Sequence, residues 1–504
     1  MAQYDVVIIG SGLGGLESAF ILSKEGYKVL VLEKNRQLGG SLQIFVRDKA
    51  IFDTGIHYIG GLNEGQNLNQ SFKYFNIMDK LNLQKMDMDG FDRITFDNDP
   101  TEYRHAQGYD NFVEQLSQQF PKERANIQKY IEEIQKVCEY FPLYQLKEDD
   151  APIIGTKYLD INTRDFIASL TSDTKLQNVL AGSSPLYAGD GAKTPLYVHA
   201  LVVNTYIESS YKCIDGGAQI ERLLSKNIKA MGGEIRNYAE VTKIVEKDGI
   251  ITHVELKNGE IIEGKNFISN MHPATTMDIL VSDKIKKAYR NRVQGLENSA
   301  SAFIVDIVLK PNTFEYINYN YYHYKRNDVW TGMHKSGDAW PDGYCVFVPK
   351  SSRSGKYADS MTILSYMQYE EVKQWENTFA TIPKHRDSRG QDYEDFKIKK
   401  AERIIDEVVK KFPQLRSVIQ SYTVSTPLTY RDYIGARDGG LYGIAKDYHD
   451  PLRTFISPTT KIPNLFFTGQ NLNMHGVLGV TVGAIRTCGV FVGQNYLIQK
   501  INKA

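Results

Sequence analysis

The sequence predicts an α/β fold in which a Rossmann-like dinucleotide-binding domain is interleaved with a second, α+β domain. Residues 4–33 have the pattern of a strand, a glycine-rich turn, a helix and a second strand. Residues 464–486, near the other end of the chain, have a strand, turn and helix pattern that would complete the same unit. A chain of 504 residues also exceeds what one hydrophobic core supports, so we expect another domain between these segments.

The N-terminal unit carries a complete glycine fingerprint, GSGLGG, between two apolar strands. Gly10 permits the tight turn, Gly12 lets the backbone approach a pyrophosphate, and Gly15 allows close packing of helix on strand. The free amides and positive end of the following helix can hold phosphates. Glu33, 23 residues after Gly10, can accept hydrogen bonds from a ribose diol. The combination predicts dinucleotide binding, which an ordinary glycine-rich turn would not explain.

We find no second fingerprint of this kind in the sequence. An enzyme that holds FAD and NADPH together in two Rossmann units would need another one near the middle of the chain, and the Gly216-Gly217 pair lacks the spacing. We therefore expect a tightly bound FAD and an external electron donor or acceptor that does not bind in a second Rossmann unit.

The C-terminal segment predicts a second contact with the same cofactor. Thr468-Gly469-Gln470-Asn471 follows a short strand, and the glycines after it indicate a helix that begins near Leu478 to Val480. The N-terminus of such a helix, aimed at an isoalloxazine ring, would stabilise a reduced anionic flavin. Close packing of the helix on a neighbour would also explain the glycines, but not the polar pair after the strand.

Composition narrows the function classes. Lys plus Arg equals Asp plus Glu, 60 against 60, so no overall field attracts nucleic acid. Four cysteines stand far apart without paired spacing, so we predict neither a metal site nor a redox dithiol: Cys138, Cys213, Cys345 and Cys488. We expect a cytoplasmic protein for three reasons. The cysteines are isolated, the N-terminus lacks a signal-peptide pattern, and no apolar run reaches about 20 residues.

Contact with the inner face of the membrane is a secondary expectation. It rests on a basic stretch made of Lys284, Lys286, Lys287, Arg290 and Arg292. A solvated helix face explains the same residues more simply, because few apolar residues accompany them.

The middle of the chain predicts helices first and then strands. Residues 110–140 have a charged amphipathic pattern, and residues 194–207 form an apolar stretch that is either a buried helix or the wall of an apolar cavity. Asp248-Gly249 and Asn258-Gly259 predict two hairpins. Residues 300–380 are strand-like and rich in Tyr and Trp, which favours a plain sheet over an aromatic substrate wall.

Several segments together resemble one known family. They are GSGLGGLESAFILSKEGYKVLVLEKN, GGS at 39–41, FDTGIHYIGG at 52–61, GGAQIERLL with GGEI, ISNMHP and NLFFTGQN. The pattern is similar to the FAD-dependent phytoene desaturases, carotenoid isomerases and retinol saturases, which belong with the amine-oxidase-like flavoproteins. The resemblance covers the flavin domain, roughly half of the chain.

The resemblance implies a division into five pieces. Residues 1–80, 213–285 and 421–504 would form the FAD-binding domain, while 81–212 would form the mainly helical part and 286–420 the sheet part of the substrate domain.

The resemblance also assigns cofactor contacts. The ADP half of FAD would be held by Gly10, Gly12, Gly14 and Glu33, and the pyrophosphate and ribityl region by Gly39, Gly40 and Ser41. Further predicted cofactor contacts are Ser11, Leu13, Gly15 and Lys34. The adenine would lie against Val241, and the flavin ring against Gly55, Ile56 and His57. Asn270, Gly469, Gln470, Asn471, Gly479 and Val480 complete the predicted set. Where the family commonly has an Asp after the final glycine, this chain has Gln470-Asn471, and His475-Gly476 replaces the usual proline-glycine turn.

The implied activity is desaturation, saturation or isomerisation of carbon-carbon double bonds in a long apolar substrate, by hydride transfer with the flavin. His57, Tyr58, Arg431 and His475 are the candidates to face the ring and to assist proton transfer. A flavin amine oxidase acting on C-N bonds and a non-catalytic flavin-binding protein are the alternatives. The oligomeric state is left open.

Overall fold

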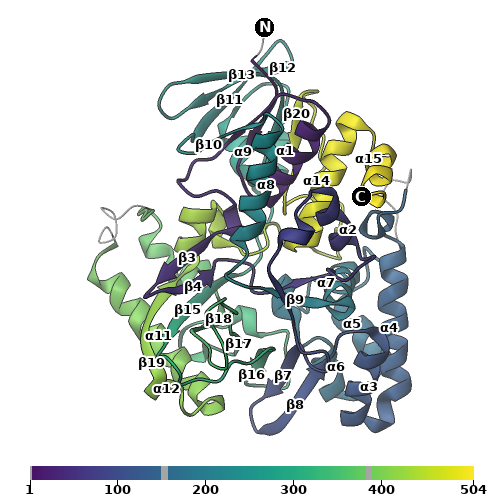
Figure 1. Ribbon diagram of the computed structural model, residues 1–504, viewed down its shortest axis with the longest axis vertical. Coiled ribbons are helices and arrows are strands. Elements are labelled where there is room, and N and C mark those ends of the chain that lie inside the picture. The colour runs from purple at the N-terminus through teal and green to yellow at the C-terminus, as the bar shows by residue number, and fades with distance from the viewer. Residues whose placement is uncertain (1–2, 149–156, 382–388) are drawn as a thin grey trace.

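The computed structural model describes residues 3–148, 157–381 and 389–504. Two large sheets dominate it (Figure 1), an upper sheet that contains the N-terminal strand and a lower sheet built from the middle of the chain. All four cysteines are buried and free. Within these residues, no helix is both long and apolar enough to cross a bilayer.

The upper sheet has the strand order β10-β2-β1-β13-β12-β11-β14, and β20 pairs with β13. Its strands are β1 (Tyr4–Ile9), β2 (Val29–Leu32), β10 (Glu234–Arg236), β11 (Val241–Lys247), β12 (Ile250–Leu256), β13 (Ile261–Ser269), β14 (Leu280–Val281) and β20 (Leu465–Phe467). The pairs among β10, β2, β1, β13 and β20 are parallel. The predicted hairpins are confirmed, because β11, β12 and β13 pair antiparallel and Asp248, Gly249 and Gly259 all have positive φ.

The register of the parallel strands brings their carboxyl ends to one edge. Ile9 pairs with both Leu32 and Ser269, and Ser269 pairs with Phe467. The residues that follow these four strands therefore emerge side by side, although the first and last are more than 450 positions apart. In open α/β sheets this edge is where ligands bind.

Helices from both ends of the chain pack together beside the upper sheet. Figure 1 shows the purple helix α1 (Leu13–Lys24) next to the yellow helix α14 (Gly476–Val492). Both are buried along most of their length, as the glycines and small residues at their contact allow. The Thr481 hydroxyl donates to the Glu17 carboxyl at 2.7 Å, and burial raises the pKa of Glu17 well above its usual value.

The lower sheet has the order β19-β15-β18-β17-β16-β7-β8 and is antiparallel except where β16 meets β7. Its strands are β7 (Asp92–Phe96), β8 (Asp99–His105), β15 (Ser301–Leu309), β16 (Asn320–Tyr324), β17 (Gly343–Phe347), β18 (Ser360–Met367) and β19 (Ile419–Ser425). One face packs on the long helix α11 (Gln391–Lys411) through Trp340, Ile404 and Val408. The smaller sheets are β3 (Ile44–Arg47) with β4 (Ala50–Asp53), and β5 (Ile59–Gly60), β9 (Ser210–Cys213) and β6 (Leu83–Lys85).

The other helices connect and cover these sheets. They are α2 (Asn67–Tyr74), α3 (Tyr109–Gln119), α4 (Arg124–Glu139), α5 (Thr163–Leu170), α6 (Thr174–Leu180), α7 (Leu196–Glu208), α8 (Ala218–Ala230), α9 (Pro273–Ile279), α10 (Lys287–Gln294), α12 (Leu415–Val418), α13 (Pro427–Thr429) and α15 (Gln494–Asn502). The predicted amphipathic stretch is thus two helices, α3 and α4, which Pro121 separates because it cannot continue the first. The apolar stretch at 194–207 is the buried helix α7.

Candidate functional site

A cavity of about 520 Å³ joins the carboxyl edge of the upper sheet to one face of the lower sheet. At the first end it is lined by residues at the carboxyl ends of the parallel strands, Gly10, Glu33, Asn270 and Gly469. At the other end it is lined by a cross-strand row of the lower sheet, Tyr322, Cys345 and Leu364. One space therefore has a polar glycine-rich end and an apolar end.

Glycines allow three backbone segments to meet at the polar end. A Cβ on Gly14 would lie 2.8 Å from the Gly469 Cα, and one on Gly40 would lie 3.2 Å from the Gly12 Cα. Gly12 and Gly39 form an isolated parallel bridge, which holds the first and second glycine segments together. A side chain at Gly14 or Gly40 would push these backbone segments apart, so the close approach of the segments depends on glycine.

Two helices begin in this region with backbone amides that could bind an anionic group. Gly12 caps α1 and His475 caps α14, and neither provides a side-chain hydrogen bond to the free amides of its helix. Neither helix has an acidic residue in its first turn. Amides left without partners at a helix start are a common phosphate or anion site, so both ends fit a dinucleotide. Helix α14 begins at Gly476, slightly before the predicted start.

The Glu33 carboxylate is held in place by hydrogen bonds to both of its oxygens. It is 7 % exposed, and its Oε2 accepts hydrogen bonds from the Ser11 amide at 3.0 Å and the Ser11 hydroxyl at 2.6 Å. Its Oε1 accepts from the Asn35 amide at 2.9 Å. The carboxylate is thus fixed at the end of β2, where it also lines the cavity.

Most of the predicted cofactor contacts line this cavity. They are Gly10, Gly12, Leu13, Gly14, Glu33, Lys34, Gly39, Gly40, Ser41, Gly55, Ile56, His57, Val241, Asn270, Gly469, Gln470, Asn471 and Val480. The structure places Ser11, Gly15 and Gly479 behind this layer. A Cβ on Gly15 would overlap the Gly10 carbonyl, and one on Gly479 would lie 2.7 Å from the Met474 Cβ, so these two glycines serve packing.

Asn471, in the Gln470-Asn471 pair that follows the final strand, has a structural partner. It is 7 % exposed, and its Oδ1 accepts a hydrogen bond from the Ile444 amide at 3.2 Å. A Cβ on Gly443 would collide with the same side chain. The amide therefore ties the turn before α14 to the 440–444 segment.

The two candidate histidines are both uncharged near neutral pH. His57 lines the cavity and stacks on Phe347, with ring centroids 4.3 Å apart, and burial lowers its pKa to about 4. His475 lies in an adjoining small cavity, where its Nε2 donates to the Leu186 carbonyl at 3.2 Å. Burial lowers the pKa of His475 to about 4 as well. An imidazole with so low a pKa is almost fully deprotonated near neutral pH, so it has no ring proton of the charged form to donate.

Tyr58 belongs to a buried polar network in the cavity wall. Its hydroxyl donates to Asp92 Oδ2 at 2.7 Å and lies 2.7 Å from the Tyr322 hydroxyl. Asn320 donates to Asp92 Oδ1 at 2.9 Å, and Asp92 is fully buried. Burial raises the pKa of Asp92 to about 7, against the lowering effect of these hydrogen bonds and of Lys212. Tyr58, Tyr322 and Tyr206 all line the cavity.

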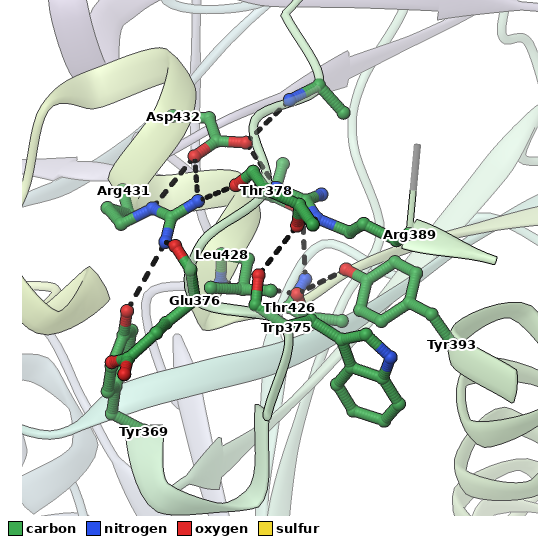
Figure 2. Close-up of polar contacts among 12 residues, drawn as sticks. Tyr369, Trp375, Glu376, Thr378, Arg389, Tyr393, Thr426, Leu428, Arg431 and Asp432 are labelled. Atoms are coloured by element: carbon green, nitrogen blue, oxygen red, sulfur yellow. Dashed lines mark hydrogen bonds and ion pairs between the residues drawn. The ribbon is translucent and has the colours of Figure 1, made fainter. Parts of the chain in front are cut away.

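Arg431 is held away from the cavity. It lies in η10 (Tyr430–Ile434), a single π-helical turn whose Tyr430, Tyr433 and Ile434 line the cavity. Its guanidinium donates to Asp432 Oδ1 at 2.9 and 2.7 Å, and to the carbonyls of Glu376 and Thr378. Figure 2 shows Arg431 and Arg389 converging on the Asp432 carboxylate. The structure thus gives Arg431 a role in joining two loops.

Sequence reasoning missed the partners of Tyr58. Asp92 begins a strand and carried no motif, while Tyr322 stood within the aromatic run that favoured a plain sheet. The run is a sheet, and the face that bears Tyr322, Cys345 and Phe347 is also a cavity wall. Helix α7 is similarly both a buried helix and, through Tyr206, part of that wall.

The chain is similar over nearly its full length to enzymes named as a reductase and an isomerase. It is 28 % identical to the all-trans-retinol 13,14-reductase of Rattus norvegicus, over 98 % of this chain and 86 % of that protein. It is also 28 % identical to the chloroplastic prolycopene isomerase of Daucus carota, over 96 % of this chain and 79 % of that protein. The chain is a homologue of these enzymes. The family resemblance and the predicted enzyme class are confirmed.

A domain match and solved structures agree with this placement. Residues 8–75 match the family described as NAD(P)-binding Rossmann-like domain. An oxidoreductase from Methanosarcina mazei has a TM-score of 0.64 at 16 % identity and covers 95 % of this chain and 99 % of its own. The cyclohexylamine oxidase of Brevibacterium oxydans has a TM-score of 0.61 at 13 % identity and covers 99 % of both chains. The predicted α/β, amine-oxidase-like fold is confirmed.

Proposed function

We propose that the protein is an FAD-dependent oxidoreductase that acts on carbon-carbon double bonds of a long apolar polyene or retinoid-like substrate. One observation carries the proposal: a single cavity is bordered by the glycine-lined edge and by the apolar row of the lower sheet. A dinucleotide and an apolar chain could therefore lie against each other in a water-poor space. The names of the homologues support the same class of substrate.

The residues at the polar end fit FAD. Gly12, Gly14 and Gly40 would admit the pyrophosphate, Glu33 would accept from the ribose diol, and Val241 would present its backbone to the adenine. When bound, FAD supplies two-electron hydride chemistry that no side chain provides. The protein contributes binding, orientation and exclusion of water.

We assign the proton of the reaction to Tyr58. Adding hydrogen across a double bond takes one proton besides the hydride, and removing it releases one. The Tyr58 phenol is hydrogen-bonded to Asp92, whose raised pKa keeps a proton available near pH 7. His57, with its low pKa, would instead order the substrate through its stack with Phe347.

A product-mass experiment tests the function. The purified protein should be yellow, with flavin absorbance that is released as FAD on denaturation. After anaerobic photoreduction, mixing with a panel of retinoids and carotenoids should give a product two hydrogens heavier for saturation or of unchanged mass for isomerisation. The oxidised protein should give a product two hydrogens lighter if it desaturates.

Two other outcomes of this experiment would contradict the proposed function. A colourless protein that does not take up added FAD would contradict both cofactor and activity. A flavoprotein that leaves every polyene unchanged but oxidises amines with release of hydrogen peroxide would instead establish the C-N alternative.

A further inference from the structure

A second cavity, of about 100 Å³, lies among α7, the turn before α14 and the 446–455 loop. Its walls are mostly apolar, with contributions from Phe141, Leu143, Tyr197, Leu201, Phe455 and Val482. Polar groups enter it from one side, through Tyr144, Lys446, Asn473 and Arg486. An apolar pocket with a few convergent polar groups is the usual form of a small-molecule site.

This second cavity is in series with the main one. A small intermediate cavity of about 40 Å³ shares Leu186, Tyr206, Gly476 and Val477 with the main cavity. The same intermediate cavity shares Tyr144, Leu201 and Met474 with the second cavity. The shared wall residues therefore place the intermediate cavity, beside the N-terminus of α14, between the main cavity and the second cavity.

Two cations face the second cavity without carboxylate partners. The Lys446 ammonium donates to the carbonyls of Thr454 at 3.0 Å and Leu472 at 3.2 Å, which leaves one of its three N–H groups. The Arg486 guanidinium lies 5.3 Å from the centre of the Phe455 ring, and its buried Nη1 has no hydrogen-bond partner. Among the described residues, neither side chain forms an ion pair.

Other polar atoms at this site are also unpartnered. The Tyr144 hydroxyl and the Asn473 Oδ1 are buried and make no hydrogen bond. Burial lowers the pKa of Arg486, and lowers that of Lys446 to about 7, so a bound anion would favour the charged form of both groups. Buried charges are normally paired, so a cluster of this kind is incomplete without an anion.

We infer that the second cavity binds the carboxylate end of a long apolar chain, held by Arg486, Lys446 and the Tyr144 hydroxyl. Arginine binds carboxylates with charge-assisted hydrogen bonds, and the apolar walls suit the carbons that precede the acid group. Because the cavities are in series, the remainder of the chain would extend toward the main cavity. The substrate class is then a polyene or acyl chain with a terminal carboxylate, an assignment that rests on the proposed function.

The test compares an acid with its ester on the flavin-loaded protein. The probe is cis-parinaric acid, a fluorescent conjugated fatty acid, and its methyl ester is the matched neutral ligand. We expect the acid to bind at least tenfold more tightly than the ester. Arg486→Gln and Lys446→Met should each weaken the acid about tenfold and leave the ester unchanged, as for loss of one charged hydrogen bond.

Two further variants separate charge from folding. Arg486→Lys keeps the cation and should retain most of the acid preference, and Lys284→Gln, which changes an exposed lysine, should alter nothing. Flavin absorbance and the thermal midpoint monitor the fold of every variant. Equal affinity for acid and ester in the unaltered protein, or equal loss of both in Arg486→Gln, would overturn the inference.

Failure of this inference differs from failure of the proposed function. Conversion of neutral polyenes by a protein without acid preference would leave the function standing and refute the carboxylate site. Arg486-dependent binding of the acid by a protein that converts no polyene would establish the site and refute the function.

Discussion

The Tyr58 hydroxyl lies between an acid and a second phenol, with no described cation bonded to it. Burial in this setting raises the pKa of Tyr58 well above its usual value and that of Asp92 to about 7. Asp92 therefore holds a proton below about pH 7 and loses it above. The phenol stays neutral throughout this range and can relay that proton.

Removal of this hydroxyl should slow turnover. We expect Tyr58→Phe to lower kcat by about 10²-fold, the usual contribution of one general acid, while flavin absorbance is unchanged. If protonated Asp92 is the source, the rate of saturation should fall as pH rises through about 7, and Asp92→Asn should flatten that profile. Tyr211→Phe, which removes a hydroxyl that donates to Asn63, is the control. Full activity in Tyr58→Phe would exclude the relay.

The sequence identified Tyr58 but could not identify its partners. Asp92 is 34 positions away and Tyr322 is 264 positions away, and both arrive through the pairing of β16 with β7. By contrast, Gly10, Gly12 and Glu33, which the sequence predicts as cofactor contacts, all line the cavity, because their spacing within one strand-turn-helix-strand unit is fixed locally.

At the scale of elements, the π-helical turn η10 divides its side chains between two tasks. Tyr430 and Tyr433 face the cavity, whereas Arg431 and Asp432 face the 376–380 loop. The Asp432 carboxylate is 1 % exposed and is shared by Arg431 and Arg389. It also accepts from the Ala380 amide at 3.0 Å. The turn therefore anchors one wall of the cavity to the 376–380 loop and to Arg389 (Figure 2).

Neutralising Asp432 should destabilise the protein. Asp432→Asn would leave two arginines without their counter-charge, which costs about 3–5 kcal/mol at a buried site. Asp406→Asn, at a solvent-exposed pair with Arg416, should cost under about 1 kcal/mol. Chemical denaturation followed by intrinsic fluorescence measures both variants. Equal stability of the two would mean that the Asp432 cluster is not a structural anchor.

Local signals explain which elements could be predicted. The hairpins at Asp248-Gly249 and Asn258-Gly259 follow from residues that accept positive φ, and the structure has both. The direction of Arg431 depends on one π-turn, whose altered register the sequence pattern does not signal. The sequence therefore made Arg431 a candidate to face the flavin ring, whereas the structure turns its guanidinium toward Asp432 and the 376–380 loop.

At the scale of the whole molecule, the dinucleotide site is a composite of distant segments. Strands from residues 4–9, 29–32, 261–269 and 465–467 lie in one parallel array. The glycine signals at both ends indicated this arrangement from the sequence. The lower sheet was harder to predict, because β7 and β8 join strands from residues 301–425 and no local pattern links them.

Removing the C-terminal segment should abolish cofactor binding. A chain that ends at residue 463 lacks β20 and α14, so β13 loses a parallel partner and Glu17 loses Thr481. We expect aggregation or a colourless protein, measured by gel filtration and flavin absorbance. Deletion of the exposed residues Lys503 and Ala504 should leave both properties unchanged. A soluble yellow protein from the shorter chain would show that the N-terminal unit binds FAD alone.

The two halves of the upper sheet lie at opposite ends of the sequence, so they are synthesised at different times. The ribosome releases β1 and α1 first and β20 and α14 last, at roughly 5–20 residues per second. Helix α1 is therefore synthesised on the order of tens of seconds before the helix that covers it. During translation its apolar face is available to chaperones, and the cofactor can be enclosed only after the last strand has emerged.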